Sequence, residues 1–123
     1  MAVRGVRGAT TATGDTPEEI LAATCELLEA LVVANRIDPA DVASVIFTTS
    51  PDLTAEYPAA AARQLGWTET ALLGAVEIGK PGGLPRCIRV LMHVNTELPQ
   101  AAMRHVYLRG AKALRPDREG MAP

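Results

Sequence analysis

Three apolar segments dominate the pattern of this chain: residues 42–49, 71–76 and 86–95. Their composition and the turn-forming residues around them predict strands. Helical patterns alternate with these strands, which favours an α/β (α+β) fold with helices on one face of a mixed sheet. Residues 78–85 are rich in Gly and Pro and predict a loop. We expect a hairpin-like pairing across this loop, at Gly82 and Gly83.

The first helix has a clear start in the sequence. Thr16 can cap it, Pro17 suits its first position, and Glu19 can complete a capping box. Apolar residues then recur at helical spacing, so one face of this helix should cover the sheet. We expect Asn35 to end the helix in a left-handed conformation. A second, alanine-rich helix is predicted over residues 58–65.

Length and composition limit how this fold can be built. The chain of 123 residues fits a single domain, 1–123, in which about 116–123 should form a flexible C-terminal tail. Hydrophobic residues make up 48% of the chain but aromatic residues only 3%, so the core must consist mainly of Ala, Val, Leu and Ile. Helices on one face leave the other face of the sheet uncovered. A symmetric partner subunit is the simplest cover.

Charge and cysteine content indicate the broad class of protein. The net charge of −2 argues against binding to nucleic acid or to an acidic membrane. No window approaches the ~20 apolar residues of a membrane span, and residues 1–13 contain no apolar stretch of signal-peptide length. Cys25 and Cys87 are expected to be buried thiols rather than a disulfide. These features together predict a soluble, cytoplasmic protein.

Most catalytic motifs are absent from the sequence. It contains no G-x-G-x-x-G, no P-loop, no G-x-S-x-G and no His, Cys or carboxylate cluster at metal-ligand spacing. We interpret His93 and His105 as structural or surface histidines. The sequence therefore gives no support to a hydrolase or a metal enzyme.

An arginine within the longest apolar strand is the most unusual residue. Strand alternation places Cys87, Arg89 and Leu91 on one face and the residues between them on the other. A guanidinium keeps its charge, so its burial is unfavourable unless anions or hydrogen-bond acceptors meet it. Arg89 is therefore either a structural residue, satisfied by a carboxylate or backbone carbonyls, or a ligand for an anion. The residues alone leave both interpretations open.

Other arginines could complete an anion site with Arg89. Arg7 ends the first strand, Arg63 lies on the second helix, and Arg115 follows the last apolar residues. Guanidinium forks match carboxylates in bidentate geometry, so together these residues could surround a small dianion. Taken singly, each is better explained as a solvated surface charge than as a ligand contact.

Glu77 and Tyr107 are the remaining candidates. Glu77 closes the third strand at the edge of the loop, where it can pair with an arginine or accept a hydrogen bond from a substrate hydroxyl. Tyr107 lies in a short predicted strand, 105–108, where its phenol can donate to a carboxylate or simply pack at a rim.

Four separated blocks of the sequence carry a specific resemblance. They are residues 3–11, residues 51–53 with 57–59, residues 82–90, and residues 104–108 with 114–117. In order and spacing these blocks resemble the monofunctional chorismate mutases of the AroH class, and the resemblance extends from residue 3 to residue 117.

The resemblance implies an assembly and a reaction. The assembly is a homotrimer in which each subunit contributes a mixed five-stranded sheet to a pseudo-barrel, with active sites between neighbours. The reaction is the Claisen rearrangement of chorismate to prephenate in phenylalanine and tyrosine biosynthesis, with no cofactor and no covalent intermediate. Such a step needs a fixed compact conformer and a positive charge where the transition state becomes polar.

Residue roles also follow from the resemblance. Arg89 would reach the ether oxygen, Glu77 would accept the ring hydroxyl, and Arg7 would hold a carboxylate; these three form the implied catalytic group. The implied substrate-binding positions are Tyr57, Arg63, Leu73, Gly74, Tyr107, Leu114 and Arg115. Tyr57 and Arg63 would come from the neighbouring subunit. Gly74 departs from the cysteine found in the best-known relatives.

Two other functions compete with this interpretation. The RidA-like imine deaminases are also trimers with an arginine in an intersubunit cleft, but the first and last blocks do not resemble them. A non-catalytic trimeric module that binds a small dicarboxylate would use the same arginines, so the sequence leaves it open.

Overall fold

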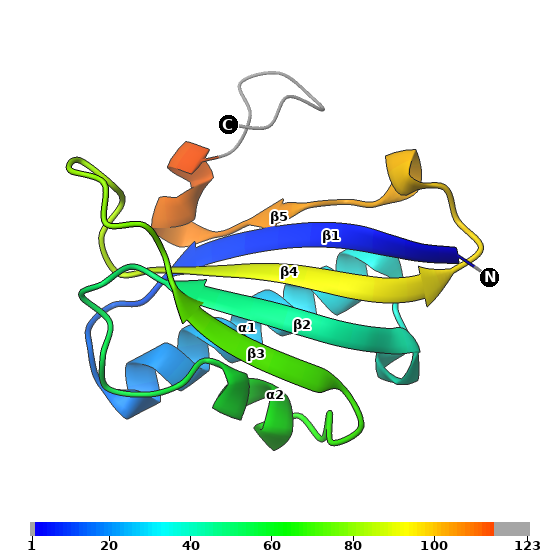
Figure 1. Ribbon diagram of the computed structural model, residues 1–123, viewed down its shortest axis with the longest axis horizontal. Coiled ribbons are helices and arrows are strands. Elements are labelled where there is room, and N and C mark those ends of the chain that lie inside the picture. The colour runs from blue at the N-terminus through cyan, green and yellow to red at the C-terminus, as the bar shows by residue number, and fades with distance from the viewer. Residues whose placement is uncertain (1, 115–123) are drawn as a thin grey trace.

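Five strands form one mixed sheet in the computed structural model, which describes residues 2–114 (Figure 1). They are β1 (Ala2–Thr11), β2 (Val42–Thr49), β3 (Ala71–Val76), β4 (Cys87–Thr96) and β5 (Val106–Tyr107), in the spatial order β3-β2-β4-β1-β5. β4 runs antiparallel to both neighbours, whereas β2 pairs with β3, and β1 with β5, in parallel. The short 3₁₀ helices are η1 (Pro39–Asp41), η2 (Gln100–Ala102) and η3 (Arg109–Leu114).

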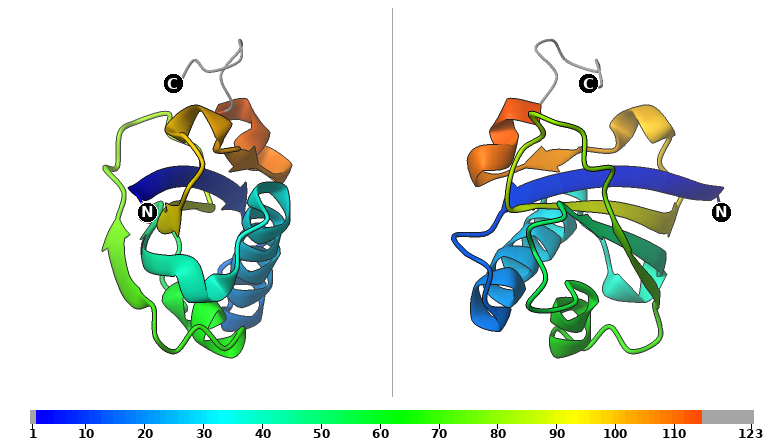
Figure 2. Two further views of the ribbon diagram at one scale, coloured as in Figure 1. Left: turned by 90° about the vertical axis from the view of Figure 1, so that its right-hand side faces the viewer. Right: turned by 60° about the vertical axis from the view of Figure 1, so that its left-hand side comes forward.

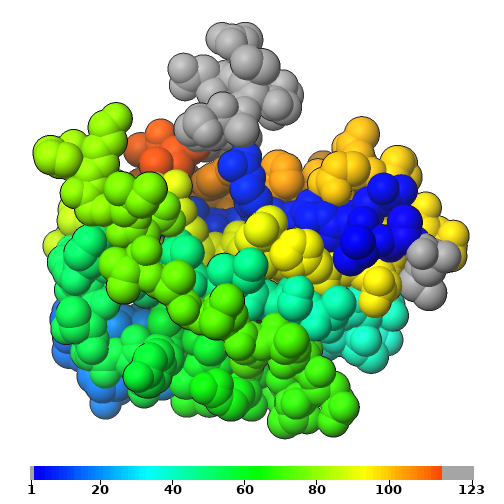
Figure 3. Space-filling view, in the orientation of Figure 1, coloured from blue at the N-terminus to red at the C-terminus, as the bar shows by residue number. Residues whose placement is uncertain are grey.

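Helices α1 (Pro17–Asn35) and α2 (Ala59–Gln64) lie on the same face of the sheet (Figure 2). This arrangement confirms the predicted class, a mixed five-stranded sheet with helices on one face. Neither α-helix of the described residues lies over the opposite face, which we call the open face. Figure 3 views the molecule from this side.

The core lies between α1 and the sheet. Alternate residues of the strands meet the apolar face of α1; the buried set includes Val6, Leu27, Leu28, Leu31, Val45, Phe47, Val90 and Met92. Burying each large aliphatic side chain contributes about 1.5–3 kcal/mol. Gly8 permits the close approach of α1, because a Cβ there would lie 3.0 Å from the Cδ1 atoms of Leu27 and Leu31. β1 continues beneath α1 as far as Thr11, so the predicted end of the first strand at Arg7 is wrong.

The start of α1 agrees with the prediction, but its end does not. Thr16 Oγ1 accepts the Glu19 amide at 3.1 Å, as an N-cap should. At the other end Arg36, with φ of 51°, adopts the left-handed conformation expected of Asn35. Asn35 stays helical, and its side-chain amide donates to the carbonyls of Leu31 and Arg104, both at 3.0 Å. It thereby anchors the segment that leads into β5.

The hairpin expected across Gly82 and Gly83 is wrong. β3 pairs with β2, and β2 lies between β3 and β4. Residues 77–86 must therefore cross the end of β2 and span two inter-strand spacings, about 10 Å. The Glu77 amide donates to the Thr49 carbonyl at 2.8 Å as this crossing begins. The crossing brings Glu77 close to the start of β4.

Cys25 and Cys87 are free thiols, as predicted, although Cys25 is only half-buried. No helix among residues 2–114 is long and apolar enough to span a membrane. Arg115 and the expected tail from about residue 116 lie outside the described residues.

Candidate active site

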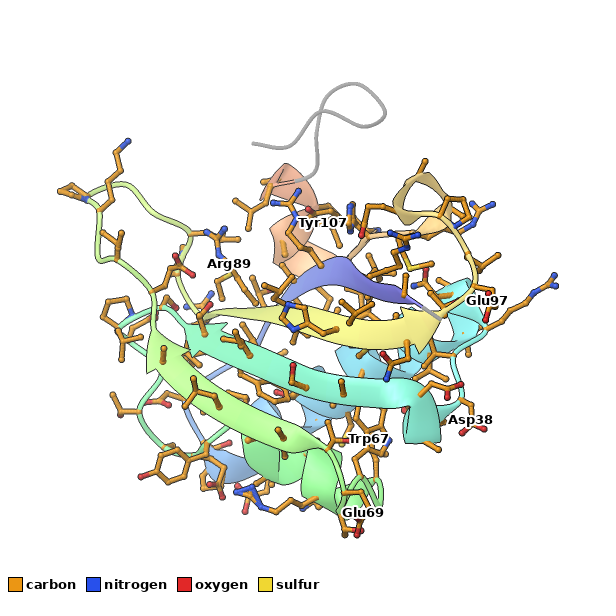
Figure 4. All side chains as sticks on the ribbon, turned by 45° about the vertical axis from the view of Figure 1, so that its right-hand side comes forward. Asp38, Trp67, Glu69, Arg89, Glu97 and Tyr107 are labelled. Atoms are coloured by element: carbon orange, nitrogen blue, oxygen red, sulfur yellow. The ribbon has the colours of Figure 1, made fainter. Side chains whose placement is uncertain are left out.

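Strand register brings the polar candidates together on the open face. Arg89 lies opposite Thr48 of β2 and Ala9 of β1, and Ala9 also pairs with Tyr107 of β5. Arg7 is two residues before Ala9 and shares its face. Figure 4 shows Arg89 and Tyr107 at the same end of the sheet. The predicted alternation in β4 is confirmed, because Ile88, Val90 and Met92 are buried on the opposite side.

These side chains line a hollow of about 250 Å³. Its polar lining comes from four strands and the loop after β3: Arg7, Thr48, Glu77, Arg89 and Tyr107. Ile46 and Leu91 contribute apolar surface. The structure thus gathers four predicted site residues, Arg7, Glu77, Arg89 and Tyr107, in one place. A second hollow of about 270 Å³ lies against residues 77–86 and shares Glu77 and Arg89 with the first.

Glu77 and Arg89 form a loose, partly exposed ion pair. Arg89 Nε lies 3.6 Å from Glu77 Oε1, and the Thr48 hydroxyl donates to the same oxygen at 2.8 Å. The side chains are 44% and 36% exposed, so the pair contributes at most about 1 kcal/mol to folding. A guanidinium has five N–H donors. Arg89 is therefore held by Glu77 yet keeps donors available for an anion in either hollow.

The buried thiol beside Arg89 has no evident acid–base role. Burial raises the pKa of Cys87, and the nearby Arg89 opposes this effect only in part. A thiol with a raised pKa stays protonated at neutral pH, so Cys87 is not a nucleophile here.

Arg7 is held by a histidine that we interpreted only as structural or surface. The Arg7 amide donates to His105 Nδ1 at 3.0 Å, so this nitrogen must be unprotonated. Partial burial, with a smaller contribution from the Arg7 charge, lowers the pKa of His105 below 6.5. His105 thus supports the backbone of an implied catalytic residue.

This contact predicts a pH dependence of stability. A depressed pKa in the folded state means that the unfolded chain binds the proton more readily, so the free energy of unfolding should fall as pH drops below about 6.5. Changing His105 to Gln keeps an acceptor without the titration and should flatten the pH dependence, measured by urea unfolding between pH 5 and about 7.5. His93→Gln leaves the Arg7 contact intact and serves as control. An unchanged slope in His105→Gln would contradict this assignment.

Other predicted site residues lie elsewhere in the subunit. Tyr57 is 75% exposed and lines a separate hollow of about 340 Å³, together with Gly74 and Val76. Arg63 is exposed on α2. Leu73 lies on the open face and is 62% exposed, whereas Gly74 pairs with the buried Phe47 and faces the opposite way. Leu114 ends η3.

Residues that sequence reasoning missed lie at the end of β2. The hydroxyl of Thr48 holds Glu77, while Ser50 and Asp52 line the second hollow. Alternation along β2 could have placed Thr48 on the face of Arg89, but only the register shows that they are opposite. Among residues 2–114 no group of three or more His, Cys, Asp or Glu side chains is placed to bind a metal.

Two arginines, a carboxylate and a tyrosine thus line one hollow on the open face of the sheet, an arrangement chemically suited to a small anionic ligand. A solved chorismate mutase from Clostridium thermocellum has the same fold, with a TM-score of 0.88 and 49% identity over 89% of this chain and 98% of its own. The curated relatives include chorismate mutase AroH from Thermus thermophilus, 54% identical over 118 residues, or 95% of this chain and 97% of the relative. The corresponding protein of Bacillus subtilis (strain 168) is 47% identical over 118 residues, or 95% and 93%.

The profile of the family "Chorismate mutase type I" matches residues 3–118. This chain therefore belongs to the type I chorismate mutases, a family of isomerases, and the resemblance noted in the sequence is confirmed. The matches give no support to an imine deaminase or to a non-catalytic binding module.

Proposed function

We propose that this chain rearranges chorismate to prephenate, in the biosynthesis of phenylalanine and tyrosine, at the hollow that Arg7, Glu77, Arg89 and Tyr107 line. The observation that carries this proposal is the convergence of these four side chains in a member of the family. Chorismate is a dianion with a ring hydroxyl and an ether bridge. Two guanidinium groups, a phenol and a carboxylate match those features in number and kind.

Each side chain has one task in this proposal. Arg7 and Tyr107 bind a carboxylate of the substrate, and Glu77 accepts the hydrogen bond of the ring hydroxyl. Arg89 donates to the ether oxygen, where negative charge grows as the C–O bond breaks and a C–C bond forms. No proton is transferred in the step, so a general base is not needed. The rate enhancement comes from fixing a compact conformer and from stabilising the developing charge.

The proposed active unit is a homotrimer whose sheets form a pseudo-barrel. Three features support it: no α-helix of residues 2–114 covers the open face, Leu73 on that face is 62% exposed, and β3 is an edge strand of the sheet. Tyr57 and Arg63 do not line the hollow of Arg89 in their own subunit, so they would serve the site of a neighbour. Leu114 and Arg115 would cover the bound substrate. We place the enzyme in the cytoplasm.

A direct assay tests the proposed function. Purified protein is incubated with chorismate, and the loss of chorismate absorbance is followed together with the appearance of prephenate. We expect an acceleration of at least about 10⁶-fold over buffer. Conversion no faster than in buffer would overturn the proposal.

A further inference from the structure

We propose that Ser50 and Asp52 are positioning residues, which set the place of Arg89 relative to Glu77 through the backbone at the start of β4. The inference rests on the proposed function for its kinetic test, but its geometric basis is independent of it. Neither side chain needs to touch the substrate for this role.

A continuous chain of hydrogen bonds joins the end of β2 to the start of β4. The Cys87 amide donates to Ser50 Oγ at 2.9 Å, and the Ser50 hydroxyl donates to Asp52 Oδ1 at 2.5 Å. The Arg86 amide donates to both Asp52 oxygens, at 3.2 and 3.0 Å. Two consecutive backbone amides are thus held by two side chains. We call this arrangement, formed by Ser50, Asp52, Arg86 and Cys87, the β2–β4 clamp.

The backbone that the clamp holds would not adopt its conformation unaided. Arg86 has φ of 50°, a left-handed conformation that residues other than Gly rarely adopt. Such a conformation persists only when surrounding contacts impose it. Ala12 adds a contact from the other side, because its amide donates to the Arg86 carbonyl at 2.8 Å. Arg89 follows only three residues later, so the direction in which β4 starts determines where its guanidinium lies.

The same end of β2 also fixes Glu77. The Thr49 carbonyl accepts the Glu77 amide at 2.8 Å, and the Thr48 hydroxyl donates to the Glu77 carboxylate at 2.8 Å. The positions of Glu77 and Arg89 therefore both depend on one short segment, residues 48–52. This shared dependence explains how a half-exposed pair can hold a defined separation of 3.6 Å between Arg89 Nε and Glu77 Oε1.

The negative charge of Asp52 determines which groups donate and which accept in the β2–β4 clamp. A carboxylate only accepts, so the Ser50 hydroxyl must donate to Asp52 and is left to accept from Cys87. The hydrogen bond from Ser50, and smaller ones from backbone amides, lower the pKa of Asp52 below 3.8, so it is ionised at neutral pH. An asparagine could still accept a hydrogen bond from the Arg86 amide. Because its side-chain amide can also donate, it would not force the Ser50 hydroxyl to act as the donor.

The kinetic test uses Asp52→Ala, Asp52→Asn and Ser50→Ala, with Asp38→Ala as matched control. Asp38 also accepts a backbone amide, that of Ala40 at 3.0 Å, but it precedes the opposite end of β2 (Figure 4). We expect Asp52→Ala to lower kcat by about 10- to 100-fold with KM changed less than about threefold, because a misplacement near 1 Å can cost about 10²-fold. Asp52→Asn and Ser50→Ala should show smaller losses, and the control should keep the native kcat.

Coupling to Arg89 separates positioning from a general structural role. If the clamp acts through Arg89, Asp52→Ala in an Arg89→Ala background should lower kcat by less than about twofold. Fully additive losses, or a native kcat in Asp52→Ala, would overturn the inference. If Asp52→Ala does not fold, Asp52→Asn and Ser50→Ala are each combined with Arg89→Ala in the same way.

A readout without substrate keeps the inference independent of the proposed function. The ¹⁵N resonance of Arg89 Nε is identified by its loss in Arg89→Lys. It should shift in Asp52→Asn and Ser50→Ala but stay in place in Asp38→Ala. An unmoved resonance in both clamp variants contradicts the inference, whereas a wild-type protein inactive on chorismate contradicts only the proposed function.

Discussion

Changing Arg89 to lysine is expected to lower kcat for chorismate by about 10²–10³-fold while KM changes less than about threefold. The loss of one transition-state donor has this magnitude in other enzymes and corresponds to roughly 3–4 kcal/mol. Lysine keeps the charge, but its single ammonium cannot meet both Glu77 and a developing oxyanion as a planar fork does. Substrate binding should suffer less, because the ground-state ether carries little charge. Steady-state kinetics measures both constants.

Stability measurements distinguish this catalytic role from a structural one. The Glu77–Arg89 pair is partly exposed, so the free energy of unfolding should change by less than about 1 kcal/mol in Arg89→Lys. Arg4→Lys, on β1, is the matched control, since the Arg4 side chain contacts the Leu98 carbonyl rather than the hollow. A near-native kcat in Arg89→Lys, or a large loss of stability, would show that Arg89 mainly serves the fold.

Mixing two inactive variants should restore activity if the active site lies between subunits. In Arg89→Ala trimers every site lacks the ether donor, and in Arg63→Ala trimers every site lacks the arginine lent by the neighbour. When the variants are unfolded together at equal amounts and refolded, one site in about four should combine an intact Arg89 with an intact Arg63. We therefore expect about a quarter of the wild-type activity from the mixture.

Each variant refolded alone is the control for this experiment and should stay inactive. Recovery in the mixture needs both arginines in one site from different chains. No recovery, with trimers verified by light scattering, would mean that each site is complete within one subunit and would refute the proposed role of Arg63.

Local pattern predicted the elements of the fold better than their arrangement. The segments 42–49 and 71–76 are strands with the predicted bounds, since apolar composition and flanking turn residues act locally. The partner of β3 depends on which strand lies beside it, and nothing near Gly82 and Gly83 encodes the passage over β2. The left-handed residue after α1 was misplaced for a similar reason, because Asn35 is retained in the helix by a contact with Arg104, far away in sequence.

The candidate site could be predicted from the residues only in part. Alternation placed Arg89 on the face opposite Ile88 and Val90, and this is confirmed. The residues alone indicated that Arg7 could join Arg89 in an anion site, and the family resemblance gave both Arg7 and Tyr107 a role there. Their proximity to Arg89 depends on the register of β1 with two different strands, which local pattern does not predict. The supporting roles of His105 and Asp52 were not predicted from the sequence. Their role is to accept backbone amides from residues far away in the sequence, Arg7 and Arg86, and local sequence pattern gives no signal for such a long-range contact.

The fold suits a reaction that needs placement rather than proton transfer. Arg7, Arg89 and Tyr107 project from hydrogen-bonded strands, so little reorganisation of the backbone is required when the transition state forms. Helix α1 holds β1 from the other side of the sheet through the contacts that Gly8 permits. The scaffold thus fixes the positive charges before the substrate arrives.

The most direct test of this account compares the binding of a ground-state ligand, the product prephenate, with that of a transition-state mimic. An oxabicyclic dicarboxylate, with its ether oxygen in the position of the breaking bond, reproduces the compact transition state. Its affinity and that of prephenate can be measured by calorimetry for the wild type and Arg89→Lys. We predict that the variant loses about 10²–10³-fold in affinity for the mimic, in step with its loss of kcat/KM, and less than about fivefold for prephenate. Equal losses for both ligands would contradict the account, because Arg89 would then bind ground state and transition state alike.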